Sequence, residues 1–347
     1  MTTPSASSCA GVDRCGLTIV EVLVAAGVLA LLAGIVLPAL HAARESSRRL
    51  QCVDHLRQLS LAVQSHAATH GTQLPPTTKN AVDARTQQLM PSGSPHRHLL
   101  PYLDQAELFS RLDFNDLAIN RPGGPPEFNS AANNHTRSLR LAVFLCPSDV
   151  QRPGATNYRA NLGYGPGVFG PEPPAIRGYA GNVAGAFVHG EITRFGDFRD
   201  GTSQTILFSE KILGDGIPDR FTPWADYFYF GPRDISTADD AVSACGSLSH
   251  PNPPHASHGG WTWLFGGWNS TWYNHVLPPN SPIPDCSEGG ERMAGGGDGA
   301  YTARSFHPGG VNAALADGSA RFISSTIDLS VWRALSTRAG DDAIGDF

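Results

Sequence analysis

The sequence predicts an α+β protein in which one long N-terminal helix packs on a β-rich, loop-rich C-terminal head. An apolar run near the N-terminus continues into a helical stripe, which predicts the long helix. The remaining chain alternates short apolar segments with turn residues, and its 38 Gly and 27 Pro among 347 residues favour strands and loops. The formal charge of −6 lacks the basic surplus of most nucleic-acid-binding domains, so we expect no nucleic-acid partner.

The apolar run covers residues 17–37, LTIVEVLVAAGVLALLAGIVL, in which Thr18 and Glu21 are the polar members. At 1.5 Å per residue, about 20 helical residues cross a hydrocarbon core of roughly 30 Å. A secretory signal peptide would have a shorter apolar run with a basic flank before it. We therefore predict a leader at residues 1–16 and a retained transmembrane helix at residues 17–40.

Glu21 places a carboxylate inside this membrane segment. Such a group costs about 2.5–3.5 kcal/mol on insertion scales and generally has a partner. In the alternative interpretation, Glu21 lies close enough to the helix end for its side chain to reach the membrane interface.

Residues 41–70 are expected to continue the helix as an amphipathic segment. Apolar residues recur there at spacings of three and four, the period of a helix with one buried face: Leu50, Val53, Leu56, Leu59, Val63 and Ala67. Gly71 is a typical helix stop, and Leu74-Pro75-Pro76 cannot continue a helix. This part of the helix needs a head, residues 71–347, to cover its apolar face.

Within the head, the sequence predicts short elements separated by turns. Strands are expected at residues 141–145, at residues 206–208 and as a meander over residues 301–323, broken by Pro308-Gly309-Gly310 and Asp317-Gly318. Short helices are expected at residues 99–112 and 331–335.

Six cysteines are present, and four remain if residues 1–16 are removed: Cys52, Cys146, Cys245 and Cys286. Four cysteines allow three pairings, and the sequence does not choose among them. One hypothesis pairs Cys245 with Cys286, which would close a long loop, and Cys52 with Cys146, which would fasten the helix to the head. Such cross-links are worth roughly 2–4 kcal/mol each.

The string Arg14-Cys15-Gly16-Leu17-Thr18-Ile19-Val20-Glu21 resembles the cleavage site of type IV prepilins and pseudopilins. The resemblance implies a pilin-like fold and a prepilin peptidase that cuts after Gly16 and methylates the new N-terminus at Leu17. It also implies that Glu21 neutralises the α-amino group of a neighbouring pilin or pseudopilin subunit during assembly. Pro38 falls where many pilins place a helix-kinking proline, whereas Leu17 stands where they usually have Phe.

Landmarks along the whole chain resemble a more specific family, the prepilin-type DUF1559 proteins with a C-terminal H-x9-D-G motif. The motif runs here from His307 to Asp317-Gly318. Other landmarks are Arg48-Arg49-Leu50-Gln51-Cys52, Leu74-Pro75-Pro76, Leu100-Pro101-Tyr102-Leu103, Leu145-Cys146-Pro147-Ser148-Asp149, Asp200-Gly201-Thr202-Ser203, Ser209-Glu210-Lys211 and the closing Trp332-Arg333-Ala334-Leu335-Ser336-Thr337-Arg338-Ala339-Gly340. The resemblance implies an architecture and not a reaction, because the biochemical function of that family is itself unassigned.

His307 and Asp317 invite a catalytic interpretation, but we favour a structural one for His307, Asp317 and Gly318. A turn aspartate commonly accepts backbone hydrogen bonds. No nucleophile with oxyanion-type surroundings accompanies the pair in the sequence. We therefore expect no catalytic residue and no enzyme.

Two further groups of residues raise the question of a metal. The four histidines His250, His255, His258 and His275 form a loose cluster in a Pro/Gly-rich segment, where surface positions are expected. Residues 295–299 offer one carboxylate, Asp298, which is too few oxygens for calcium. We expect neither a metal nor a cofactor.

One segment is dense in aromatic residues: Trp261, Trp263, Trp268, Trp272 and Tyr273. Packing in the core of a β-rich head is the favoured explanation. The alternative is a surface that stacks on sugars or binds a partner protein.

The sequence thus favours a pilin-like structural or assembly subunit, anchored by one helix in the bacterial cytoplasmic membrane. The alternative is a tethered, exported binding protein for a carbohydrate or protein partner that forms no fibres. Arg44, Arg48 and Arg49 after the span would keep the head in the cytoplasm under the positive-inside rule. We nevertheless expect a cytoplasmic N-terminus and a periplasmic or extracellular head, because large domains translocate regardless of nearby charge and the leader must meet its peptidase.

Overall fold

The computed structural model describes residues 19–77, 80–82, 89–91, 93–116, 118–119, 127–128, 130–165, 184–231, 235–288, 297–341 and 347. The chain divides into two compact units, residues 1–47 and residues 48–347. The predicted leader, with Gly16 and Leu17, lies outside the described residues.

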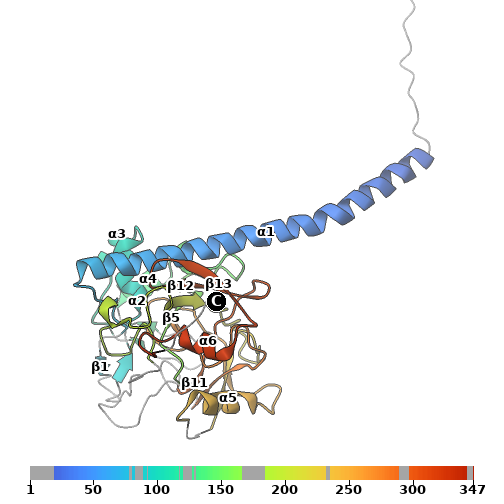
Figure 1. Cartoon of the computed structure of the whole chain (residues 1–347). Coiled ribbons are helices and arrows are strands. Elements are labelled where there is room, and N and C mark those ends of the chain that lie inside the picture. The colour runs from blue at the N-terminus through green and yellow to red at the C-terminus, as the bar shows by residue number, and fades with distance from the viewer. Residues whose placement is uncertain are drawn as a thin grey trace, which may run out of the picture. The chain divides into compact units, whose positions relative to one another are not determined.

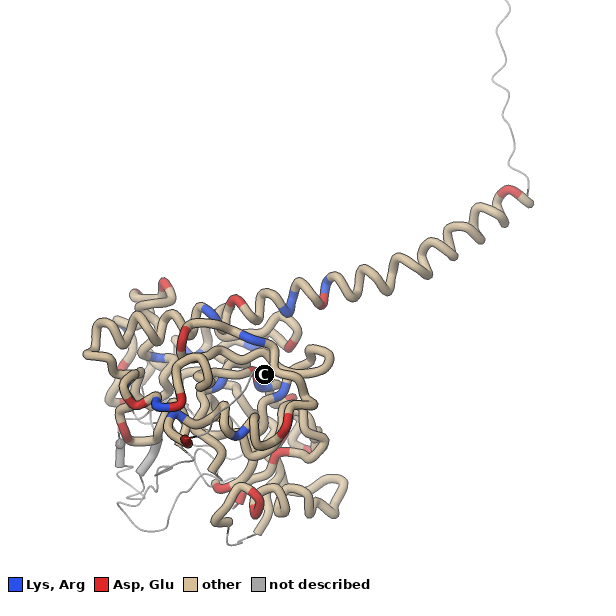
Figure 2. Tube along the Cα trace, viewed as in Figure 1, with Lys and Arg blue, Asp and Glu red and all other residues tan. Residues whose placement is uncertain are grey.

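The described part of the first unit belongs to helix α1, which begins at Ile19 and ends at Thr69 (Figure 1). Between Glu21 and Arg44 this helix carries no Asp, Glu, Lys or Arg (Figure 2). The large apolar side chains of this stretch are exposed, and it is long and apolar enough to span a membrane. A continuous helix, with Pro38 inside it, therefore stands where the sequence predicts a transmembrane segment.

In the second unit, residues 48–69 of α1 bury one face against the head. The buried positions follow the helical period: Cys52, Leu56, Leu59, Ser60, Ala62, Val63, His66 and Ala67. Leu50, predicted for this face, is instead 63% exposed, because it lies two residues before Cys52 and so about 200° around the helix. Gly71, with a left-handed φ of 62°, follows the end of the helix as predicted.

The main sheet of the head has five strands in the order β13-β12-β6-β5-β9. They are β5 (Tyr158–Asn161), β6 (Ile206–Glu210), β9 (Trp272–Tyr273), β12 (Gly310–Leu315) and β13 (Ala320–Ser324). β5 and β9 run parallel, and the other neighbours are antiparallel. The β12–β13 hairpin turns around Asp317-Gly318, and β6 covers residues 206–208, so these predicted strands are confirmed.

A second sheet has four strands in the order β11-β10-β7-β8. They are β7 (Tyr227–Phe230), β8 (His255–Ala256), β10 (Asp285–Glu288) and β11 (Gly299–Ala300). β7 and β10 run parallel, and helix α5 (Ala238–Gly246) packs against β10 and β11. Two short hairpins complete the described strands: β1 (Asn80–Val82) with β2 (Leu89–Pro91), and β3 (Ala118–Ile119) with β4 (Glu127–Phe128).

The remaining helices are short. They are α2 (Pro95–Leu99), η1 (Leu100–Tyr102), α3 (Ala106–Ser110), α4 (Ala131–Arg137), η2 (Ala142–Phe144), η3 (Phe195–Asp197) and α6 (Leu329–Ala334). The single helix predicted at residues 99–112 is divided, because Asp104 has a φ of 58° between η1 and α3. The predicted final helix is present as α6, whose N-terminus is capped by the side chain of Asp328.

Two predicted strands are wrong. Residues 141–145 form the 3-10 turn η2, which buries Phe144; a short apolar run is compatible with either structure. Residues 301–305 form no strand, and three of their backbone N–H groups donate to side-chain oxygens instead of a neighbouring strand. Tyr301 donates to Asn274, Thr302 to Asp285, and Ser305 to Asn280. His307 therefore does not end a strand but lies in the turn before β12.

Strand β12 runs beside the buried part of α1 (Figure 1). The hydroxyl of Ser60 donates to the carbonyl of Leu315 at 2.6 Å, and the amide of Gln64 donates to the carbonyl of Ala316 at 3.0 Å. From Cys52 to Gln64 the helix rises about 18 Å, which matches the roughly 20 Å that β12 spans. The two ends of β12 therefore meet two different turns of the helix.

Candidate functional site

Four potential metal ligands lie together in the second unit: Cys52, Cys146, Glu210 and His307. The two Sγ atoms, a carboxylate oxygen and a ring nitrogen all lie within 4.8 Å of one another. All four residues are buried. We call these four residues the Cys–His–Glu centre.

Four separate segments supply this centre. Cys52 comes from the buried face of α1, and Cys146 follows the 3-10 turn η2. Glu210 is the last residue of β6, and His307 lies in the turn before β12. Because the four segments are far apart in the sequence, the centre exists only in the folded chain.

Asn312 of β12 holds the carboxylate of Glu210. The backbone N–H of Asn312 donates to Oε2 at 2.7 Å, and its side-chain amide donates to Oε1 at 3.0 Å. His307 Nε2 lies 3.2 Å from Oε1 of Glu210 and 3.4 Å from Sγ of Cys146. The same imidazole nitrogen therefore faces a carboxylate and a sulfur atom.

A tight turn positions Cys146. Its N–H donates to Oδ1 of Asn157 at 2.9 Å, and its carbonyl accepts from the N–H of Asp149 at 3.0 Å. The carboxylate of Asp149 accepts hydrogen bonds from the Asn157 amide at 2.6 Å and from Leu213 N at 2.9 Å. Burial raises the pKa of Asp149, and these hydrogen bonds oppose that rise.

A buried charge network lies next to the centre. Asp285 accepts from Nζ of Lys211 and from the guanidinium of Arg304, with Arg304 Nη2 at 3.1 Å. Burial lowers the pKa of Lys211 to about 7; the nearby guanidinium groups of Arg159 and Arg304 add to this, and Asp285 opposes it. Burial by itself would raise the pKa of Asp285, but Lys211 and Arg304 outweigh it, and that pKa is lowered. Lys211 and Arg304 thus share one ionised carboxylate.

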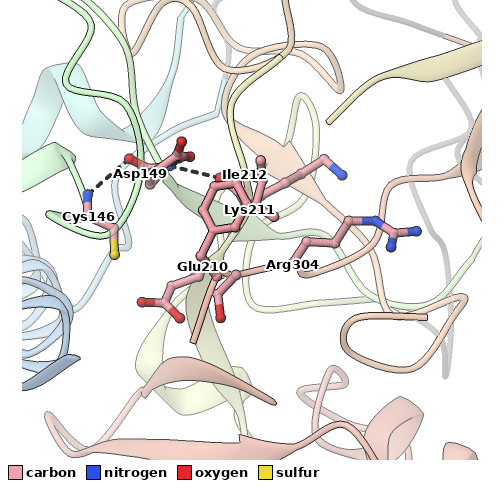
Figure 3. A pocket seen from close by; sticks show the side chains of 9 residues that line it. Cys146, Asp149, Glu210, Lys211, Ile212 and Arg304 are labelled. Atoms are coloured by element: carbon pink, nitrogen blue, oxygen red, sulfur yellow. Dashed lines mark hydrogen bonds between the residues drawn. The ribbon is translucent and has the colours of Figure 1, made fainter. Parts of the chain in front are cut away.

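A hollow of about 10 Å³ is lined by residues of both the centre and this network, among them Cys146, Glu210, Lys211 and Arg304. Figure 3 shows Glu210 and the sulfur of Cys146 on one side and the cationic groups of Lys211 and Arg304 on the other. A space of this size holds about one water molecule. Phe306, which also lines the hollow, is 56% exposed.

Both hypothesised disulfides are present. Cys52 and Cys146 are bonded across 94 residues, with Cα atoms 5.2 Å apart, and they link α1 to the head. Cys245 and Cys286 are bonded across 41 residues and link α5 to β10 inside a second apolar core. These pairings confirm the hypothesis that the sequence left open among three.

The match with known families covers most of the chain. The model of the family described as "Protein of unknown function (DUF1559)" matches residues 41–330. The chain belongs to the DUF1559 family. Searches of the curated proteins and of the solved structures each found no significant match.

The structure separates the two ends of the DUF1559 motif H-x9-D-G. His307 belongs to the Cys–His–Glu centre, whereas Asp317 lies beyond the other end of β12, roughly 20 Å away along the strand. The carboxylate of Asp317 accepts from the backbone N–H of Ser319 at 2.8 Å. His307 and Asp317 therefore do not form a catalytic pair, and Asp317 has the turn-forming role that the sequence favours.

Gly318 completes the turn between β12 and β13. Its φ of 94° lies in the left-handed region that favours glycine. A Cβ at this position would lie 3.0 Å from Nε2 of Gln64, which is itself bonded to Ala316. The motif thus fixes one end of β12 at the centre and the other end against α1.

The expectation that the four histidines lie at the surface is wrong for three of them. His255, His258 and His275 are buried, and His250 is exposed. His275 lies 2.7 Å from the carbonyl of Trp332 and 2.9 Å from the hydroxyl of Tyr273, and stacks on the Trp332 ring at 3.7 Å. Polar partners and ring stacking compensate for the burial of His275, which a Pro/Gly-rich sequence does not reveal.

The aromatic segment packs mainly in the core, as the sequence favours. Trp263, Trp268, Trp272 and Tyr273 are all at most 2% exposed. Trp261 is partly exposed, donates its indole N–H to the carbonyl of Gly214 at 2.9 Å and lies under the guanidinium of Arg152. These four buried side chains leave the proposed sugar-stacking surface without most of its members.

The other residues that the sequence analysis singled out are Glu21 and the glycine-rich segment of residues 295–299. Glu21 lies in the first turn of α1 with an exposed side chain. Gly295 and Gly296 lie outside the described residues, while Gly297 donates its N–H to Ser287 Oγ at 2.9 Å.

Sequence reasoning missed the role of Glu210 and Asn312. Glu210 stands in the landmark Ser209-Glu210-Lys211, and Asn312 lies inside the H-x9-D-G motif of DUF1559. Both residues therefore belong to recognised landmarks, but the sequence predicts no role for either. A carboxylate that ends a strand of buried residues is the signal that could have marked Glu210, because such a group needs partners.

Proposed function

We propose that this DUF1559 chain is a pilin-like structural or assembly subunit without catalytic activity, anchored in the bacterial cytoplasmic membrane. A prepilin peptidase would cut after Gly16 and methylate Leu17. The N-terminus would face the cytoplasm, and residues 48–347 would lie in the periplasm or outside the cell.

The observation that carries the proposal is that successive parts of α1 have three different surfaces. The same helix bears Glu21 in its first turn, an uncharged apolar stretch up to Arg44, and then a face buried in the head. The disulfide from Cys52 to Cys146 adds a covalent link between that buried face and the head. A pull on the helix would therefore reach the head through a covalent bond, which suits a subunit that is held or moved by its N-terminal helix.

Glu21 gives the proposal its specificity. A carboxylate in hydrocarbon costs about 2.5–3.5 kcal/mol, and a neighbouring subunit's methylated amine at Leu17 would offset that cost. An ordinary anchor helix needs no such acidic residue, since neutral apolar side chains insert more favourably.

The hollow beside the Cys–His–Glu centre does not suit an organic substrate, because it has room for about one water molecule. The burial of the aromatic segment likewise gives the alternative, a tethered carbohydrate-binding protein, less support.

Mass spectrometry of the protein purified from its host's membranes tests the processing step. We expect a mature chain that begins at a methylated Leu17. Recovery of a chain that still carries Met1 and the leader would contradict the proposal.

The variant Glu21→Ala tests the assembly step. It should insert into the membrane at least as well as the wild type and lose cross-linking between subunits in the membrane. Glu45→Ala, which removes a carboxylate from the same helix outside the apolar stretch, is the matched control and should cross-link normally. Equal cross-linking by both variants would count against a role of Glu21 in assembly.

A further inference from the structure

The Cys–His–Glu centre has the composition of a zinc site as well as a disulfide. We propose that the centre binds one zinc ion when the disulfide between Cys52 and Cys146 is reduced. The ligands would be the two cysteine Sγ atoms, Nε2 of His307 and a carboxylate oxygen of Glu210. This inference concerns the second unit and does not depend on cleavage after Gly16 or on Glu21.

The ligand set selects the metal. Zinc in proteins takes four ligands in a tetrahedron, drawn from cysteine sulfur, histidine nitrogen and carboxylate oxygen. The four candidate atoms already lie within 4.8 Å of one another, although zinc–ligand distances of about 2.0–2.3 Å would also require the two sulfurs to move apart. Calcium and magnesium prefer six or more oxygen ligands and would find one carboxylate here.

The partners of the ligands also fit a metal site. Carboxylate ligands in zinc sites are commonly oriented by hydrogen bonds, and Asn312 donates two to Glu210. Cys146 is held by the bond from its N–H to Asn157, and His307 by the bond from its N–H to Oγ of Ser305 at 3.1 Å. These bonds use the main chain of both residues and leave Sγ and Nε2 facing the centre.

Reduction of the disulfide between Cys52 and Cys146 needs a reductant, and a dithiol supplies what the reaction requires. A dithiol gives two electrons and two protons to the disulfide and leaves as a cyclic disulfide, and Cys52 and Cys146 become thiols. Zinc binding then releases both thiol protons, because the ligands are thiolates. The ion would replace the covalent link between α1 and the head, so the junction would stay closed in both redox states.

The second disulfide supplies an internal comparison. Cys245 and Cys286 form a pair of the same chemistry, but in the described part of the chain no histidine or carboxylate joins them in a ligand cluster. A specific site should therefore depend on His307 and Glu210, whereas adventitious binding to free thiols should not.

The test uses the full chain in detergent micelles. The protein is reduced with dithiothreitol without oxygen, desalted, incubated with zinc and desalted again, and its zinc content is measured by mass spectrometry. We expect about one tightly held zinc per reduced chain and none per oxidised chain. Cobalt in place of zinc should give the thiolate charge-transfer and ligand-field bands of a tetrahedral site.

Two ligand variants and one control complete the test. His307→Ala and Glu210→Gln should each weaken zinc affinity at least about tenfold, measured by competition with a chromophoric chelator. His250→Ala, which removes an exposed histidine of the same head, should bind like the wild type. Glu210→Gln keeps the shape of the side chain, so its cobalt spectrum remains informative if His307→Ala fails to fold.

The proposal would be overturned if the reduced chain held no more zinc than the oxidised chain. It would also be overturned if zinc affinity and the cobalt spectrum were the same in Glu210→Gln as in the wild type. If reduction unfolded the chain, the free thiols would bind zinc without help from Glu210, and Glu210→Gln would then behave like the wild type.

Discussion

The hydroxyl of Ser60 in α1 donates a 2.6 Å hydrogen bond to the carbonyl of Leu315, the last residue of β12. Both groups are buried, and the bond joins residues 255 positions apart in the sequence. It therefore lies in the contact between α1 and the main sheet and helps to hold the two together.

Replacement of Ser60 by Ala should destabilise the protein by about 0.5–1.5 kcal/mol, because the carbonyl of Leu315 would lose one buried donor and keep the backbone N–H of Gly318. Ser65→Ala is the matched control: Ser65 is exposed and its hydroxyl donates to the carbonyl of Leu61 in the same helix, so a change within about 0.5 kcal/mol is expected. Urea unfolding of the detergent-solubilised chain measures both values. Equal effects of the two substitutions would show that the contact between α1 and the main sheet does not depend on the bond from Ser60 to Leu315.

The adjacent glycines of the motif should respond differently to substitution. A Cβ at Gly310 would lie 2.0 Å from the carbonyl oxygen of Ile323 on the paired strand. The backbones of the two paired strands would have to move apart to make room for it. Gly309 has a φ of 86° and open space around it, so Gly309→Ala should cost only the backbone strain, about 1–2 kcal/mol. We expect Gly310→Ala to lower the melting temperature more than Gly309→Ala, and the reverse order would contradict the observed β12–β13 register.

Lys211 should make stability depend on pH above neutrality. Its pKa is lowered from 10.5 to about 7 in the folded chain, mainly by burial. Between these two values the unfolded chain binds one more proton than the folded chain, so the free energy of unfolding rises with pH across that window and is lower below it. Lys211→Met should remove this contribution.

The measurement compares the two proteins by urea unfolding at about pH 6 and about pH 9. The wild type should gain more stability than Lys211→Met between these conditions. The same pH dependence in both would show that Lys211 keeps its proton in the folded chain throughout this range.

Loss of the disulfide at α1 should loosen the buried part of the helix. Cys52→Ser with Cys146→Ser opens a loop of 94 residues, worth about 4–5 kcal/mol in the chain-entropy description, and should speed hydrogen exchange over residues 52–67. Cys245→Ser with Cys286→Ser is the comparison and should speed exchange in α5 and β10 instead. Exchange that rises equally in both regions in each variant would mean that the head unfolds as one unit.

Much of this fold follows from local patterns. The apolar run and the stripe from Leu56 to Ala67 predict α1, and Gly71 predicts its end, because helical period and glycine conformation are properties of a few neighbouring residues. Asp317-Gly318 predicts the hairpin turn for the same reason. Residues 141–145 were predicted wrongly, since an apolar run of that length does not distinguish a strand from a buried turn.

Local sequence patterns predict the membrane-compatible helix, the turn at Asp317-Gly318 and membership in a family with this order of landmarks. The folded chain alone reveals which cysteines meet, that His307 faces Glu210 rather than Asp317, and that three of the four clustered histidines are buried. Distance along the chain explains the difference. Helix and turn signals act over a few residues, whereas the centre joins side chains from four segments, whose meeting depends on how α1 and the sheet pack.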